Sequence, residues 1–142
     1  MISIDVDGAV NKTGGSFSLV ITCNGRSEVK NFKTDIGKDI TPIEMKGINA
    51  AMKYFLNKKP NELGVINTDN LLSVKLITGV WTLREDSTNE RLKKELRKAV
   101  KVYGLIKDRV VLKYINREYN SADQYAKQTL KQLTKEAHKN EG

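Results

Sequence analysis

The chain of 142 residues is long enough for one domain with a hydrophobic core, because 39% of its residues are hydrophobic. No apolar run approaches the roughly 20 residues that span a bilayer, and the N-terminus lacks the basic-then-apolar layout of a signal peptide. A single cysteine, Cys23, can form neither a disulfide framework nor a thiolate metal site. We therefore expect a cytoplasmic protein in which Cys23 is a small core residue.

The formal net charge of +8 is concentrated in the second half of the chain. Residues 1–70 carry 9 Lys and Arg against 8 Asp and Glu, whereas residues 71–142 carry 16 against 9. This asymmetry favours a polyanionic partner, with nucleic acid as the first candidate. The alternative is that the lysine-rich helices only form a solvated surface.

Three strands are predicted over the first 33 residues. In residues 2–10, ISIDVDGAV, apolar and polar residues alternate with the two-residue period of a half-buried strand, so Asp5 and Asp7 project from the same face. Residues 16–24 are rich in β-branched side chains, and the NGR sequence that follows signals a hairpin turn. The chain then returns as a polar edge strand at residues 26–33.

The first predicted helix begins with Thr41 as the N-cap, Pro42 in the first turn and Glu44 at the third helical position. Apolar residues then recur at helical spacing until residues 57–60. A short apolar strand at residues 64–69, GVINTD, ends in a carboxylate.

Helices dominate the remaining chain. A short helix is predicted at residues 70–79, and a second at residues 87–104, which opens on a capping-box pattern with Ser87 as the N-cap and closes on a glycine. A strand at residues 108–116 and an amphipathic helix at residues 121–137 complete the pattern.

This order predicts an α/β fold. Three hairpin-linked strands followed by alternating helices and strands indicate a five-stranded mixed sheet, with the first three strands antiparallel and helices on both faces. We expect one domain over residues 1–142 with a polar tail at about 134–142. Because no surplus apolar stripe is evident, we also expect a monomer without a membrane segment.

Four carboxylates stand at the ends of predicted elements, where sites in open α/β sheets are found. They are Asp7, Glu44, Asp69 and Asp123. Each also has an ordinary explanation, since acids complement helix N-termini and begin turns. Together, on a basic protein, they suit a hard cation such as Mg²⁺, which takes oxygen ligands.

The same residues carry a resemblance to a known family. DGA at residues 7–9, a glutamate near a helix start, TDN at residues 68–70, and the run Asn120, Ala122, Asp123 and Ala126 resemble ribonuclease H of type 1. The resemblance covers residues 2 to about 133 and includes the order of strands and helices. The four acids are separated by 37, 25 and 54 positions, which also fits.

The resemblance implies endonucleolytic hydrolysis of the RNA strand in an RNA–DNA hybrid, leaving 5′-phosphate and 3′-hydroxyl ends. It implies two Mg²⁺ ions, with Mn²⁺ as an alternative, at the scissile phosphate. By position, Asp7 would bridge both ions, Glu44 and Asp69 would hold the leaving-group side, and Asp123 the nucleophile side. Asp5 is left out of the ligand set, and we expect it to be either a hydrogen-bonded carboxylate beside the ligands or a carboxylate on the sheet surface.

Hybrid recognition in such a protein depends on backbone groups, small polar side chains and phosphate-binding cations. The candidates for the RNA strand are Gly8, Asn11, Thr13, Gly14, Thr41 and Asn70. Arg84 and Lys94, within the basic segment 84–101, are candidates for gripping the DNA strand. Trp81 lies just before this segment, and we expect it at a helix junction or in the core rather than as a stacking platform.

Two features depart from the family pattern. The loop before Asp123, INREYNS, has no histidine where many members carry one, so Arg117 or Glu118 is expected to contribute instead. The paired asparagines that often precede the helical glutamate are replaced by Ile40 and Thr41. The alternatives are a non-catalytic nucleic-acid-binding domain of the same fold, or a related metal-dependent nuclease such as a resolvase or exonuclease.

Overall fold

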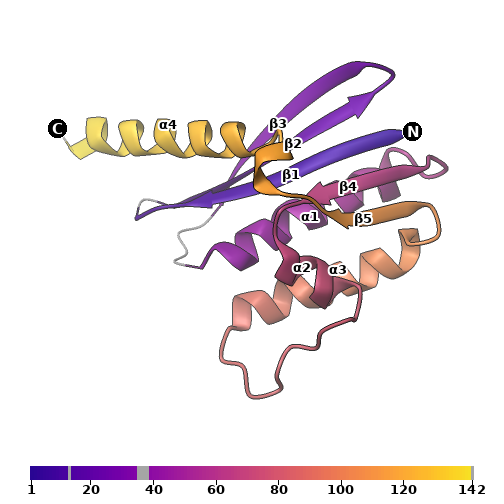
Figure 1. Ribbon diagram of the computed structural model, residues 1–142. Helices are drawn as coiled ribbons and strands as arrows, with labels where there is room; N and C mark the ends of the chain where they lie inside the picture. The colour runs from indigo at the N-terminus through magenta and orange to yellow at the C-terminus, as the bar shows by residue number, and fades with distance from the viewer. Residues whose placement is uncertain (13, 35–38, 142) are drawn as a thin grey trace.

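The fold is built on one mixed five-stranded sheet, seen in a computed structural model that describes residues 1–12, 14–34 and 39–141 (Figure 1). The strands follow the order β3-β2-β1-β4-β5 across the sheet. β1 is antiparallel to β2 and β2 to β3, whereas β4 is parallel to both β1 and β5. The strands are β1 (Ile2–Val10), β2 (Gly15–Cys23), β3 (Arg26–Thr34), β4 (Gly64–Thr68) and β5 (Val110–Tyr114). The predicted fold class is confirmed.

Helices cover both faces of this sheet, as predicted. α4 crosses one face over β1, β2 and β3, while α1 packs on the other face against β1 and β2 (Figure 1). α3 packs on α1, and the short α2 packs between α3 and β5. The helices are α1 (Ile40–Asn57), α2 (Leu71–Ile77), α3 (Glu90–Ile106) and α4 (Asp123–Glu141), and a 3₁₀ turn, η1 (Arg117–Tyr119), precedes α4.

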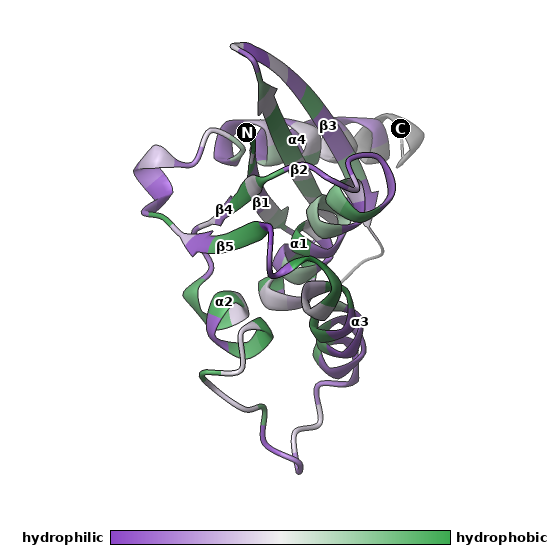
Figure 2. Cartoon of the chain, turned by 90° about the vertical axis from the view of Figure 1, so that its right-hand side faces the viewer, coloured by the Kyte–Doolittle hydropathy of each residue, from purple (hydrophilic) through white to green (hydrophobic). Residues whose placement is uncertain are grey.

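The hydrophobic core lies between the sheet and α1. The apolar residues of the alternating pattern in β1, Ile2, Ile4 and Val6, are fully buried. A side chain at Gly47 of α1 would lie 2.6 Å from Val6, so this glycine allows the helix backbone to approach β1 closely. Hydrophobic residues dominate β1 and β2, whereas the edge strand β3 is largely hydrophilic, as expected (Figure 2).

The predicted hairpin turn between β2 and β3 is confirmed. Asn24 and Gly25 both have positive φ angles, 53° and 76°. This conformation is that of a type I′ turn, which matches the twist of the flanking strands and favours the Asn-Gly pair.

The predicted start of the first helix is wrong by two residues. Asp39 is the N-cap of α1, and its carboxylate accepts from the backbone N–H of Thr41. Pro42 is thus the third helical residue, a place where the missing N–H is still harmless because the first four N–H groups of a helix have no intrahelical partner. Glu44 consequently lies beyond the first turn and does not serve the helix N-terminus.

Other boundaries also differ from prediction. α3 is capped by Asn89, whose side chain accepts from the N–H of Leu92, instead of by Ser87. The helix passes through Gly104 to Ile106, because the apolar contact of Ile106 with the core continues the helical stripe. α4 continues to Glu141, so the expected polar tail at about 134–142 is helical in its described part. Asn70 is the N-cap of α2 and not its first residue.

Two side chains lie only partly as expected. Trp81 is 47% exposed, so the core alternative is wrong, but it lies in the loop that joins α2 and α3, as the helix-junction alternative predicts. Its backbone N–H donates to the carbonyl of Lys75. Cys23 is only partly buried, packed at the margin of the core and without a disulfide partner. None of the helices in the described part of the chain has the length and apolar character that crossing a membrane requires.

Two glycine substitutions test this packing in opposite directions. Gly64→Ala places a methyl group 2.2 Å from the ring of Phe55, and we expect overpacking to lower the free energy of unfolding by about 1–3 kcal/mol. Gly104→Ala lies in the last turn of α3 with no neighbour within 4 Å, and we expect it to raise stability by about 0.5–1 kcal/mol. Urea unfolding measures both, and equal effects at the two sites would contradict the described packing.

Candidate active site

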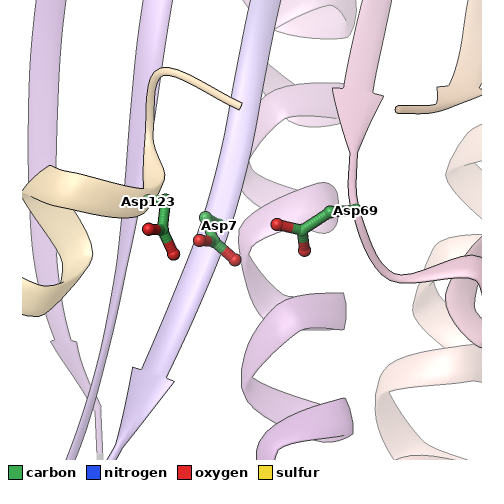
Figure 3. Close-up of side chains that lie close together, drawn as sticks. All are labelled: Asp7, Asp69 and Asp123. Atoms are coloured by element: carbon green, nitrogen blue, oxygen red, sulfur yellow. The ribbon is translucent and has the colours of Figure 1, made fainter. Parts of the chain in front are cut away.

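Three aspartates from distant parts of the sequence converge at one end of the sheet. Asp7 lies on β1, Asp69 directly follows β4, and Asp123 is the first residue of α4 (Figure 3). One carboxylate oxygen of each lies within 4.8 Å of the other two. Asp7 lies between the other two and is fully buried.

The strand register explains why Asp7 and Asp69 meet. β1 and β4 are parallel neighbours in which Val6 pairs with Thr68, so the next residue in each strand direction is an aspartate. The start of α4 is attached to the same place, because the side-chain amide of Asn120 donates to the backbone carbonyl of Val6 at 2.8 Å. The carboxyl ends of two parallel strands and one helix start therefore meet, as is usual for sites in such sheets.

Glu44 joins this group from α1. Its side chain is 3% exposed and interacts electrostatically with both Asp7 and Asp69. Gly8 allows the approach, because a Cβ there would lie 3.1 Å from the side chain of Ile43 and 3.4 Å from the backbone nitrogen of Glu44. All four predicted carboxylates thus share one site.

The site contains buried oxygens without hydrogen-bond donors. Oδ2 of Asp7, Oε2 of Glu44 and Oδ2 of Asp69 are each inaccessible to solvent and have no donor. Unsatisfied buried acceptors are rare in folded proteins, and carboxylate oxygens are the preferred ligands of hard divalent cations. This set of carboxylate oxygens therefore fits a divalent metal ion, which would be the missing partner of the three unsatisfied oxygens.

Burial and mutual repulsion shift the acidities of the four groups. Burial raises the pKa of Asp7 to about 7, and a hydrogen bond with Asp123 adds to the rise. Burial raises the pKa of Glu44 to about 10, with the charge of Asp7 as the next cause. Burial also raises the pKa of Asp69, against the opposing effect of Arg117. Without metal, Glu44 therefore retains its proton at neutral pH, and Asp7 is near the midpoint of its titration.

Asp123 shows the opposite behaviour. Its burial alone would raise the pKa, but hydrogen bonds with Asp7 and Lys127 and the positive charges of Lys127 and Arg117 lower it. Lys127 Nζ lies 2.9 Å from Asp123 Oδ2, and Arg117 Nε lies 3.9 Å from both Asp69 Oδ2 and Asp123 Oδ1. Sequence reasoning missed Lys127, although its i,i+4 spacing from Asp123 on a helix is a recognisable ion-pair signal.

The predicted nucleic-acid contacts lie on several elements around the site. Asn11 Oδ1 accepts from the backbone N–H of Gly14 in the β1–β2 turn, and Thr13 lies outside the described residues. Thr41 is half-buried in the first turn of α1, and Asn70 Oδ1 accepts from the N–H of Ser73 as the cap of α2.

The two predicted phosphate-gripping residues are both exposed. Arg84 lies in the loop before α3 and pairs with Asp86, and Lys94 lies on α3 itself. Nothing in the structure tests whether any of these residues contacts nucleic acid, so their role stays a prediction.

Comparison with known proteins places the fold. No family model matches the chain, and no curated protein matches its sequence. Solved structures do match: LC11-RNase H1, isolated from compost by a metagenomic approach, has a TM-score of 0.78 at 20% identity, covering 94% of this chain and 97% of that one. The N-terminal RNase H domain of a Mycobacterium tuberculosis protein has a TM-score of 0.76 at 20% identity, covering 96% and 97%.

A further match is LC11-RNase H1 in complex with an RNA/DNA hybrid, with a TM-score of 0.71 at 20% identity, covering 87% of this chain and 92% of that one. These similarities extend over almost the whole of both chains. The protein therefore has the fold of type 1 ribonuclease H, as its motifs indicate.

The pKa shifts predict how stability depends on pH when metal is removed. Asp7 and Glu44 have ordinary pKa values near 4 when unfolded but about 7 and about 10 when folded. Between pH 5 and 8 the folded state thus binds more protons than the unfolded state, so its stability falls as the pH rises. We expect the Tm measured in EDTA to decrease over this interval.

Asp7→Asn should reduce this decrease, because it removes one of the repelling charges. At pH 8 in EDTA we expect a gain of about 2 kcal/mol, or roughly 4–8 °C in Tm, over the unmodified chain. Asp108→Asn, the same change at an exposed aspartate, is the control. Parallel pH profiles for all three proteins would contradict the described electrostatics.

Proposed function

We propose that the chain is an endoribonuclease that hydrolyses the RNA strand of RNA–DNA hybrids and leaves 5′-phosphate and 3′-hydroxyl ends. The observation that carries the proposal is the convergence of Asp7, Asp69 and Asp123, with Glu44 beside them, on a fold of the ribonuclease H type. The hybrid complex of LC11-RNase H1 supports the choice of substrate.

The four carboxylates would hold two Mg²⁺ ions, with Mn²⁺ as the alternative. Their oxygens form an all-oxygen donor set, which hard cations prefer, and three of these oxygens are buried without donors. Bound divalent ions in such sites activate water as the nucleophile and stabilise the charge on the leaving oxygen of a phosphodiester. We assign Asp7 as the shared ligand because it lies between Asp69 and Asp123.

Residues of the chain prepare the site for a phosphate. Asp7 and Glu44 are held rigidly by burial, so their oxygens are oriented before the substrate arrives. Arg117 lies at the open side of the site, 71% exposed and 3.9 Å from two of the carboxylates. Its guanidinium can turn to a phosphate oxygen. Arg117 would then take the place of the missing loop histidine, but it would stabilise negative charge instead of transferring protons.

Binding of the hybrid is attributed to shape and charge. Asn11, Thr41 and Asn70 provide small polar groups near the site, and the exposed Arg84 and Lys94 provide cations on and before α3. The net charge of +8 favours association with a polyanion. A cytoplasmic location and a monomeric state remain predictions from the sequence.

The direct test is incubation of the purified chain with labelled RNA–DNA hybrid, duplex DNA and duplex RNA, in Mg²⁺ or EDTA. We expect cleavage of the RNA strand of the hybrid alone, and only with Mg²⁺. Asp7→Asn should lower the cleavage rate at least about 100-fold, since outer partners alone change activity 10–100-fold and Asp7 is a proposed ligand. Gel analysis of the end groups checks the predicted 5′-phosphate.

Asp108→Asn controls for the loss of a negative charge. Asp108 is exposed and precedes β5, at the opposite end of the sheet from Asp69, so its neutralisation should leave cleavage unchanged. Hybrid binding without cleavage would favour the non-catalytic alternative, and cleavage of duplex DNA would favour a resolvase or exonuclease. Full activity of Asp7→Asn would refute the assigned site.

The contribution of α3 to binding can be measured through salt dependence. Lys94→Ala should weaken hybrid binding at low salt and reduce the slope of log K against log salt by about 1, if Lys94 neutralises one phosphate. Lys107→Ala, at the opposite end of α3, is the matched control and should leave the slope unchanged. Binding is measured by fluorescence anisotropy, and both lysine substitutions are made in the Asp7→Asn variant so that the hybrid is not cleaved during the titration. Equal slopes for the two lysine variants would remove Lys94 from the interface.

A further inference from the structure

Asp5 connects three elements directly behind the candidate active site. It lies on β1 two residues before Asp7, on the same face of the strand. Its Oδ1 accepts from the side-chain amide of Asn67 on β4 at 2.9 Å. Its Oδ2 accepts twice from Ser121, just before α4, from the backbone N–H at 3.2 Å and from the hydroxyl at 2.7 Å.

These bonds tie the residues just before α4 to β1 and β4. Ser121 stands two residues before Asp123, the first residue of the helix. The neighbouring Asn120 donates to the carbonyl of Val6 and accepts from the N–H of Ala122. Two consecutive residues ahead of α4 are thus bonded to β1. Asn120 binds a backbone carbonyl, which every strand has, whereas Ser121 binds the Asp5 side chain, which is specific to this sequence.

Asp123 depends on this attachment more than the other carboxylates do. Its side chain is 22% exposed, whereas those of Asp69 and Asp7 are buried by the sheet and α1. Its position relative to Asp7 therefore depends on where α4 starts, in addition to the ion pairs of its carboxylate with Arg117 and Lys127. A small displacement of Ser121 would move Asp123 away from the shared site.

We propose that Asp5 is a positioning residue that fixes the start of α4, and thereby Asp123, so that the site binds divalent cations with full affinity. The inference rests on the role proposed above for the four carboxylates. We do not assign Asp5 as a ligand, because it is not part of the converging group of Asp7, Asp69 and Asp123, and its oxygens face Asn67 and Ser121.

The chemistry of the bonds distinguishes variants of Asp5. A carboxylate accepts at both oxygens, so it serves Asn67 and Ser121 together. Asn at this position can still accept from Ser121 through its oxygen and can donate to Asn67 if that amide turns over. Ala at this position removes every bond. Asp5→Asn is therefore the conservative variant, and Asp5→Ala the disruptive one.

The test is calorimetric titration of Mg²⁺ into the full chain without hybrid. We expect Asp5→Ala to weaken Mg²⁺ binding about 10–100-fold, the range found when residues that orient metal ligands are removed. Asp5→Asn should restore most of the affinity. Ser3→Ala is the matched control, because Ser3 shares the face of β1 and the bond to Asn67, whereas its side chain is not bonded to any described residue of α4 or of the loop before it.

A second variant approaches the same bond from the other side. Ser121→Ala deletes the hydroxyl bond and leaves the backbone N–H, so we expect a smaller loss of Mg²⁺ affinity in the same direction. The double variant Asp5→Ala with Ser121→Ala should bind no more weakly than Asp5→Ala alone, because the two residues act through one contact. Amide resonances of residues 121–123 in the metal-free protein should shift in each variant but not in Ser3→Ala.

Unchanged Mg²⁺ affinity in Asp5→Ala would overturn the proposal. An equal loss of Mg²⁺ affinity in Asp5→Asn and Asp5→Ala would also overturn it, since the charge of Asp5 alone would then be responsible. If Asp5→Ala does not fold, unchanged affinity in Ser121→Ala overturns it. Hybrid cleavage by the unmodified chain is measured in parallel. If the unmodified chain cleaves the hybrid but the variants bind Mg²⁺ normally, only this inference is defeated. If the variants bind Mg²⁺ more weakly but the unmodified chain does not cleave the hybrid, only the proposed function is defeated.

Discussion

The mutual repulsion of four carboxylates is the constraint on which this structure depends. Asp7, Glu44, Asp69 and Asp123 lie together, and three of them are largely shielded from water. Like charges in a buried site cannot all ionise without compensation. The chain supplies part of the compensation through Arg117 and Lys127, and retained protons supply the rest when no metal is bound. A site that is electrostatically unfavourable when empty is well suited to attract divalent cations and, with them, a phosphate.

The backbone makes this arrangement with few special features. Parallel pairing of β1 with β4 sets Asp7 beside Asp69, and Gly8 leaves room for α1 to bring Glu44 close. Side chains then complete what the sheet begins, because Asn120 binds the carbonyl of Val6 and places α4 against the end of β1. The site is thus determined by the strand register, Gly8 and Asn120 as much as by the acids themselves.

The sequence was informative where a residue pattern has one physical solution. Alternation in β1, the Asn24-Gly25 turn and the acids at element ends predicted the sheet, the hairpin and the convergence of Asp7, Asp69 and Asp123, which Glu44 approaches from α1. Helix boundaries were less predictable, because Asp39 and Thr41, or Ser87 and Asn89, are both good caps and tertiary contacts choose between them. For Trp81 the sequence left the core and a helix junction open, since a large apolar residue in a loop carries no periodicity to show which way it faces. The hydrogen-bonded role of Asp5 was foreseen, but its partner Ser121, 116 positions away, could not be.

The segment 117–127 has a consequence for how the protein is made. It brings the fourth acid, Asp123, together with two cations, Arg117 and Lys127, that lie against the acidic site. A growing chain on the ribosome therefore gathers three acids first and receives the fourth only with its neutralising partners. Maturation of the site is coupled to docking of α4, so the four acids assemble only after residues 117–127 have been synthesised.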